Sequence, residues 1–242
     1  MYFYLISIIL VVICAGLGAR ASSKVKSAYH AYGAMPTASH MTGYDTATRL
    51  LRRGGVKDIA VGRVRGELTD HYHPTKKIVN LSESVYGDDS IASVAVAAHE
   101  VGHVMQKKAG YLPYKIRTAL VPITNIGSRL AMPLVLIGLL LDLLILSADS
   151  QVGYYLAMVG VALYGLSTVF ALVTLPVELD ASRRAKKMLV DEGILQASEL
   201  PYADKMLDAA ANTYVASLVT SALYFLRFLL WVVMLFGGRR RR

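Results

Sequence analysis

The sequence Ala97-Ala98-His99-Glu100-Val101-Gly102-His103 places two histidines four positions apart, with a glutamate directly after the first. It ends a run of small and β-branched apolar residues that begins at Ile91, and this run predicts a helix. Positions i and i+4 lie on the same face of a helix, so the two imidazoles can share one tetrahedral zinc ion. Glu100 can then serve as general base for a zinc-activated water molecule. The stretch therefore predicts a catalytic zinc site.

The alternative is a surface helix whose two histidines bind nothing. The residues around the motif are alanine and valine rather than charged residues, which indicates that the helix is buried. Buried histidine and glutamate side chains need polar partners, and a metal ion supplies them. We therefore favour the metal site.

The chain has 242 residues, which suits one or two domains, and 55% of them are hydrophobic. Four long apolar stretches account for this high fraction and predict a membrane protein. The single cysteine, Cys14, lies inside the first stretch, so the sequence holds no disulfide framework.

The net charge of +9 comes largely from lysines and arginines that flank the apolar stretches. This placement favours a role with anionic lipid headgroups and in membrane topology. The sequence has no nucleic-acid recognition motif, so we expect no nucleic-acid partner.

The apolar stretches also predict the topology. Residues 2–18 have no lysine or arginine before them and three just after, which predicts a retained anchor with its N-terminus outside. Residues 119–146 and 152–175 predict a transmembrane hairpin whose short connection, 147–151, lies outside. The domain between these spans then lies on the cytoplasmic side of a bacterial plasma membrane.

The fourth apolar stretch, residues 214–236, carries Arg227 near its middle, which is costly in lipid. Four full crossings would also place the basic tail, 237–242, outside, against the positive-inside tendency. Whether this stretch fully spans the membrane is left open.

Residues 27–114 predict a mixed soluble region. A short helix is expected over 42–55, strands over 59–64 and 77–81, and a turn at Asp70-His71-Tyr72-His73-Pro74. Asp88-Asp89-Ser90 suits the N-terminus of the His99 helix. Only about eight apolar residues precede His99, too few to cross a bilayer, so we expect a core helix and not the membrane-buried zinc site of a site-2 protease.

A site with two histidines needs a third protein ligand. The hairpin returns the chain to the same side of the membrane, where Pro176 suits the first turn of a helix and Gly193 its end. Glu178 is the predicted third ligand. Asp180 is the alternative ligand, or else orients a ligand or pairs with Arg184 four positions on.

Four residues are candidates for stabilising the oxyanion or contacting substrate: His71, Tyr72, Arg183 and Tyr214. The simpler interpretation of His71 and His73 is that they are solvated turn residues, and that of Arg183 is a solvated charge.

Four segments carry a resemblance to a known family. They are Leu68–Tyr72 (LTDHY), Asn80–Tyr86 (NLSESVY), Ser93–His103 (SVAVAAHEVGH) and Leu175–Ala185 (LPVELDASRRA). The chain resembles, over nearly its whole length, the bacterial membrane zinc metallopeptidases typified by YugP. The resemblance implies a gluzincin-like peptidase with zinc on His99 and His103, Glu100 as catalyst and Glu178 as third ligand. A metzincin is excluded, because Ala109 stands where its third histidine would be.

Together these observations predict a mostly α fold with a small β element: an integral membrane zinc-peptidase domain split by a transmembrane hairpin. The expected segments are an anchor (1–19), the first part of the peptidase domain (20–115), the hairpin (116–175), the second part (176–213), an apolar helix (214–236) and the tail. The expected function is endopeptidase cleavage of membrane-associated or misfolded proteins, with one zinc per chain.

The alternative function is a catalytically silent membrane scaffold that binds zinc. It is disfavoured because a structural zinc site needs four protein ligands, usually including cysteine, and Cys14 lies in a span. The expected partners are a polypeptide substrate and the lipid bilayer. A membrane-protein partner or a homo-oligomer is left open.

Overall fold

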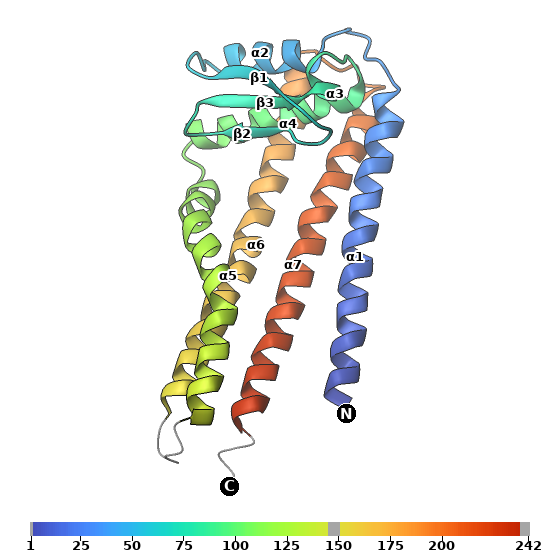
Figure 1. Ribbon diagram of the computed structural model, residues 1–242. Coiled ribbons are helices and arrows are strands. Elements are labelled where there is room, and N and C mark those ends of the chain that lie inside the picture. Colours follow the sequence, from blue (N-terminus) through green and yellow to red (C-terminus); the bar gives the residue numbers. More distant parts are fainter. Residues whose placement is uncertain (1, 145–150, 238–242) are drawn as a thin grey trace. The chain divides into compact units, whose positions relative to one another are not determined.

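A computed structural model describes residues 2–144 and 151–237 of the chain (Figure 1). It is mostly helical with one three-stranded sheet, which confirms the predicted fold class. In chain order the elements are α1 (Tyr2–Gly33), α2 (Gly43–Arg53), β1 (Ala60–Val64), β2 (His71–His73), β3 (Ile78–Ser82), α3 (Glu83–Tyr86), α4 (Ile91–Lys108), α5 (Leu112–Leu144), α6 (Val152–Asp191) and α7 (Leu200–Gly237). Residues 147–150 of the predicted connection and 238–242 of the basic tail lie outside the described residues.

The chain divides into two compact units. One, here called the helical unit, comprises residues 1–19, 116–174 and 215–242. The other, the mixed unit, comprises residues 20–115 and 175–214 and holds the sheet together with α2, α3 and α4.

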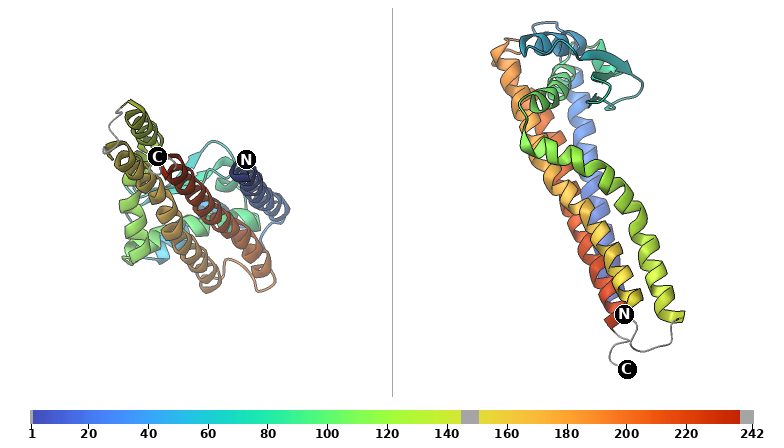
Figure 2. Two further views of the ribbon diagram at one scale, coloured as in Figure 1. Left: turned by 90° about the horizontal axis from the view of Figure 1, so that it is seen from below. Right: turned by 90° about the vertical axis from the view of Figure 1, so that its left-hand side faces the viewer.

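The helical unit is built from the apolar parts of α1, α5, α6 and α7. Figure 2 shows α5 and α6 side by side, and glycines allow their backbones to approach: a Cβ on Gly160 would lie 2.6 Å from the Ala131 carbonyl oxygen. Among the described residues, four helices are long and apolar enough to cross a membrane. Many of their leucines, isoleucines and valines are exposed, as suits contact with lipid, so the chain is a membrane protein.

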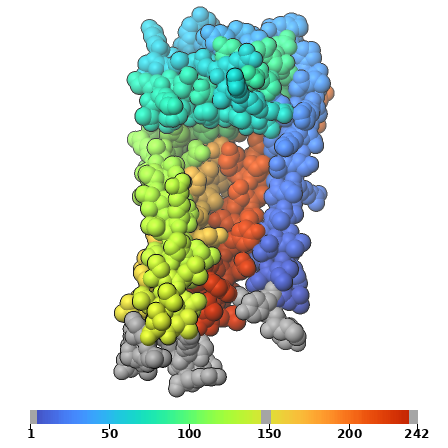
Figure 3. Space-filling model, in the orientation of Figure 1, coloured from blue at the N-terminus to red at the C-terminus, as the bar shows by residue number. Residues whose placement is uncertain are grey.

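The sheet of the mixed unit has the order β1-β3-β2, with β1 parallel and β2 antiparallel to the central β3. The two predicted strands are confirmed with shifts of about one residue. The turn predicted at residues 70–74 is wrong, because His71, Tyr72 and His73 pair with Asn80, Val79 and Ile78. In Figure 3 the sheet region, residues 60–82, is coloured cyan on the face of the mixed unit that is turned to the viewer.

Helix α4 is the centre of the mixed unit, and thirteen of its residues are buried. Its predicted N-terminus is confirmed: the Ser90 hydroxyl accepts a hydrogen bond from the Ser93 amide at 3.2 Å, and the Asp88 carboxylate accepts from both hydroxyls. Valine and leucine side chains from α2, β3 and α3 pack around α4. A closely packed helix of this kind holds its side chains in fixed positions.

Helix α6 does not begin at Pro176, as the sequence predicted, but runs unbroken through it. Proline lacks the amide N–H that would donate a hydrogen bond to the carbonyl four residues earlier. The backbone hydrogen bonds of neighbouring residues can still maintain the helix when one such bond is missing. The predicted end is confirmed: Gly193 has φ +60°, and its amide donates to the Val190 carbonyl at 3.0 Å.

Helix α4 approaches the 175–191 part of α6 closely at Gly102. A Cβ there would lie 2.6 Å from the Ala181 carbonyl oxygen, closer than real Cβ atoms come to backbone. We expect Gly102→Ala to destabilise the protein by about 1–3 kcal/mol through overpacking, although alanine is the better helix former. Thermal unfolding in detergent would measure this.

Gly87→Ala is the matched control, because nothing lies within 4 Å of its added Cβ and its φ is −105°. An unchanged melting temperature for Gly102→Ala would contradict the close approach.

Candidate metal centre

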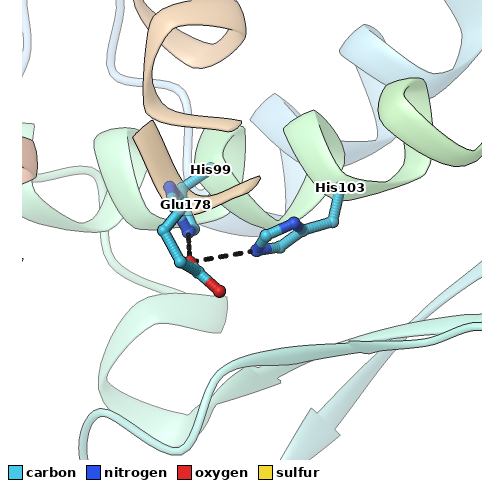
Figure 4. A group of neighbouring side chains, drawn as sticks. All are labelled: His99, His103 and Glu178. Atoms are coloured by element: carbon cyan, nitrogen blue, oxygen red, sulfur yellow. Dashed lines mark hydrogen bonds and ion pairs between the residues drawn. The ribbon is translucent and has the colours of Figure 1, made fainter. Parts of the chain in front are cut away.

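The two histidines of the motif lie one turn apart on α4, and their side chains face a single carboxylate from α6 (Figure 4). His99 Nε2 is 3.2 Å and His103 Nε2 is 3.4 Å from Glu178 Oε2. One ligand atom from each of the three residues lies within 4.8 Å of the others. The structure thus brings the predicted ligands together from two helices far apart in the sequence.

This arrangement fits a zinc ion. Tetrahedral zinc with ligands at about 2.1 Å requires ligand atoms about 3.4 Å apart. The two nitrogen-to-oxygen distances, 3.2 and 3.4 Å, already match that spacing. Two imidazoles and one carboxylate are also the donor set of many catalytic zinc sites, which leave the fourth position for water or substrate.

Gln106 fixes the orientation of His103. Its Nε2 donates to the Val177 carbonyl at 2.7 Å and to Asp180 Oδ2 at 2.9 Å, so its Oε1 must face His103 Nδ1, 3.0 Å away. A carbonyl oxygen only accepts, so Nδ1 carries a proton. The neutral ring then leaves Nε2 unprotonated and free to bind a metal ion.

Ser182 holds the ring of His99 in place. Its hydroxyl lies 3.1 Å from His99 Nδ1. Ser182 follows Glu178 by four positions on α6, so both side chains lie on the same helical face toward α4. Each histidine is therefore held on its Nδ1 side by a polar side chain, with Nε2 toward the carboxylate.

Burial shapes the electrostatics of these groups. Glu178 is 2% exposed; burial alone would raise its pKa, but hydrogen bonds and charge from His103 and His99 hold the pKa well below its ordinary value. Burial would likewise lower the pKa of His103, and its interactions with Glu178 outweigh this and raise it. Without metal, the cluster thus favours a charged carboxylate beside a protonated imidazole.

Glu100, the predicted general base, is 8% exposed. Within residues 2–144 and 151–237 its carboxylate has no hydrogen bond or ion pair. It follows His99 directly on α4, and its charge acts on His103. A buried carboxylate of this kind has free acceptor capacity for a water molecule.

Asp180, the alternative ligand, is engaged elsewhere. Its Oδ2 accepts from Gln106 and, at 2.6 Å, from Arg184 Nε. Burial would raise its pKa, but the hydrogen bonds from Arg184 and Gln106 lower it below the ordinary value. Arg183 has a 79% exposed side chain, 3.9 Å from Asp180. We therefore keep Glu178 as the proposed third ligand.

The other residues predicted to stabilise the oxyanion or contact substrate differ in whether their polar groups already have hydrogen-bond partners. His71 Nδ1 lies 2.8 Å from the Thr69 carbonyl and its Nε2 lies 3.1 Å from Asn80 Nδ2, so both nitrogens are engaged. The buried Tyr72 hydroxyl has no hydrogen-bond partner in the described part of the chain, and burial raises its pKa to about 12. Tyr214 lies on α7. Of these, Tyr72 is the group whose hydroxyl can still donate a bond.

Sequence reasoning missed Gln106 and, as a partner of His99, Ser182. Their signals are the i+3 spacing of Gln106 from His103 and the i+4 spacing of Ser182 from Glu178. Both signals are weak until the ligands themselves are placed.

The raised pKa of His103 makes metal affinity depend on pH. Below that pKa, which lies above the ordinary 6.5, zinc must displace a proton, so the apparent affinity falls by about tenfold per pH unit; above it, this dependence vanishes. We expect zinc to bind at least about tenfold more weakly at pH 5.5 than at pH 8.0, as measured by competition with a chelator. In Glu178→Gln, affinity falls overall and the loss begins at lower pH. Equal affinity at both pH values in the wild type would contradict this account.

Gln106→Met keeps the bulk of the side chain but removes the acceptor for His103 Nδ1. We expect the dissociation constant for zinc to rise by about 10- to 100-fold, because the imidazole loses its fixed orientation. Gln196→Met, at an exposed position of the same unit, is the matched control and should bind zinc normally. Unchanged affinity in Gln106→Met would mean that the amide does not orient the ring.

Comparison with known proteins identifies the family. A family model described as "Putative neutral zinc metallopeptidase" matches residues 5–233. The chain is 40% identical over 232 residues to "Putative membrane protease YugP" of Bacillus subtilis (strain 168), covering 96% of this chain and 97% of that protein. No solved structure matches the chain. Both matches span nearly all of the sequence, and the chain therefore belongs to the YugP-type family of zinc metallopeptidases.

Proposed function

We propose that the protein is a membrane-anchored, gluzincin-like zinc endopeptidase that cleaves membrane-associated or misfolded proteins. The observation that carries the proposal is the convergence of His99 Nε2 and His103 Nε2 on one oxygen of Glu178, at 3.2 and 3.4 Å. These three residues would hold one zinc ion per chain. When bound, zinc polarises the scissile carbonyl and lowers the pKa of water.

Glu100 would accept the proton of the attacking water on its carboxylate and pass it to the leaving amine. Its burial, its lack of a hydrogen-bond partner among the described residues and its position after His99 all support this role. Gln106 would keep His103 in the tautomer that leaves Nε2 free, and Ser182 would hold the His99 ring at its Nδ1 side.

The sheet offers a place for an extended polypeptide. Strand β2 is an edge strand, paired on one side only within the three-stranded sheet, and it contacts α4. An unpaired strand edge can form main-chain hydrogen bonds with a substrate in extended conformation. We propose that substrate binds along β2, where the Tyr72 hydroxyl would be a donor for the oxyanion.

We place the mixed unit on the cytoplasmic side of the bacterial plasma membrane. The mixed unit carries many lysines and arginines close in sequence to the apolar segments: Arg20, Lys24, Lys26, Lys107, Lys108, Lys115, Arg183, Arg184, Lys186 and Lys187. Such residues favour the cytoplasmic side.

The alternative function, a silent zinc-binding scaffold, has less support. A closed structural site needs a fourth protein ligand, and the cluster found among the described residues has three members.

Glu100→Gln separates the two functions. Wild type and Glu100→Gln, each purified in detergent, should both contain about one zinc per chain. The variant should cleave an unfolded protein substrate at least about 100-fold more slowly than the wild type, because it lacks the general base. Glu83→Gln, an exposed acid in the same unit, is the control and should cleave normally.

Three outcomes would count against the proposal. Full activity in Glu100→Gln would remove Glu100 as the base. A wild type that takes up no zinc when supplied with it would remove the metal site. Zinc in both proteins with cleavage by neither would favour the scaffold.

A further inference from the structure

The helical unit contains a cavity with polar side chains in a largely apolar lining, and the metal site does not use it. Its volume is about 340 Å³. The lining residues come from all four apolar helices, and they are Val11, Ser128, Ala131, Met132, Tyr164, Tyr224, Arg227 and Phe228. Four of the eight are polar, in the most apolar part of the chain.

The cavity lies near the middle of the apolar segments. Arg227 is ten positions from the end of α7 at Gly237 and twelve from residue 215, where the helical unit begins, which is about 15 and 18 Å along the helix. Ser128 and Tyr164 are also at least ten positions from either end of their segments in this unit. An arginine side chain reaches only about 7 Å, so Arg227 cannot bring its charge to either membrane surface.

The charge of Arg227 is not compensated within the described residues. The structure gives its exposed side chain no hydrogen bond or ion pair there. The described segments of the helical unit contain one acidic residue, Asp142, which is fourteen positions from Ser128 on α5, or about 21 Å along the helix. A cation at this depth is costly unless an anion reaches it from outside the chain.

We propose that this cavity docks a transmembrane helix of a partner protein that carries an aspartate or glutamate at the middle of its span. The guanidinium of Arg227 would bind the carboxylate through two parallel hydrogen bonds. The hydroxyl groups of Tyr164 and Tyr224 provide further donors, and Val11, Met132 and Phe228 provide apolar contacts for the helix around the acid.

The depth of Arg227 in the membrane favours a partner helix over an anionic lipid as the occupant of the cavity. The phosphate of an anionic lipid lies at the membrane surface, about 15 Å from the middle of the hydrocarbon core. A carboxylate on a spanning helix can lie at the middle, and polar groups there pair with each other across helices.

The test measures association of the full-length protein with a synthetic transmembrane peptide in phosphatidylcholine vesicles. Donor and acceptor dyes on the protein and the peptide report binding by energy transfer. The peptide is a leucine-alanine helix of about 20 residues with glutamate at its centre, and its control has glutamine there. We expect the glutamate peptide to bind at least about tenfold more tightly, and Arg227→Leu to abolish this preference while Arg227→Lys keeps part of it.

Arg129→Leu is the matched control, because Arg129 lies exposed near the middle of α5 but does not line the cavity. It should keep the preference. Circular dichroism checks that each variant is folded, and the comparison of the two peptides on wild type tests the proposal without any variant.

Three results would overturn the proposal. The first is equal binding of the glutamate and glutamine peptides to wild type. The second is loss of the preference in Arg129→Leu, which would show a general effect of charge. The third is loss of the preference when phosphatidylglycerol is added, which would make an anionic lipid the occupant. None of these readouts depends on peptidase activity.

Discussion

The candidate metal centre depends on how closely two helices approach each other. Ligand atoms about 3.4 Å apart must come from α4 and from residues 175–191 of α6, so the helical backbones must nearly touch. Gly102 permits this, because a Cβ there would meet the Ala181 carbonyl. The same contact places Ser182 on His99, and Gln106 between His103 and Asp180. A glycine within the HExxH segment thus determines the geometry of residues on both sides of it.

In the β element, a half-buried carboxylate holds the edge strand in place. Asp70 accepts hydrogen bonds from the Ser82 amide at 2.7 Å and from its hydroxyl at 3.0 Å, which fixes the start of β2 against the end of β3. Burial raises the pKa of Asp70, although the bonds from Ser82 act against it. Ser84 follows, accepting from the Tyr29 hydroxyl at 2.8 Å. Two of the segments that carry the family resemblance are therefore explained by how they position the edge strand.

Local sequence patterns predicted most of the fold. The His99 helix, its Ser90 cap and strands β1 and β3 follow from hydrophobic periodicity, capping residues and β-branched side chains within a few positions. Strand β2 was missed because its three residues form a strand only through pairing with β3. Pro176 predicts a helix start, but α6 continues through it, because hydrogen bonds of neighbouring residues maintain the helix and the sequence alone does not show them. The pairing of Asp180 with Arg184 follows from their i+4 spacing and is confirmed, whereas the contact of Gln106 with Asp180 joins distant segments, which no local pattern contains.

The order of the ligands along the chain has a consequence for biosynthesis. His99 and Glu178 are 79 positions apart, and the apolar parts of α5 and α6 lie between them. A growing chain that has made α4 holds both histidines and Glu100, the proposed general base, but lacks Glu178, the proposed carboxylate ligand. It acquires Glu178 only after both intervening apolar segments have left the ribosome. The nascent chain therefore cannot assemble the complete candidate metal site before its membrane hairpin has been synthesised.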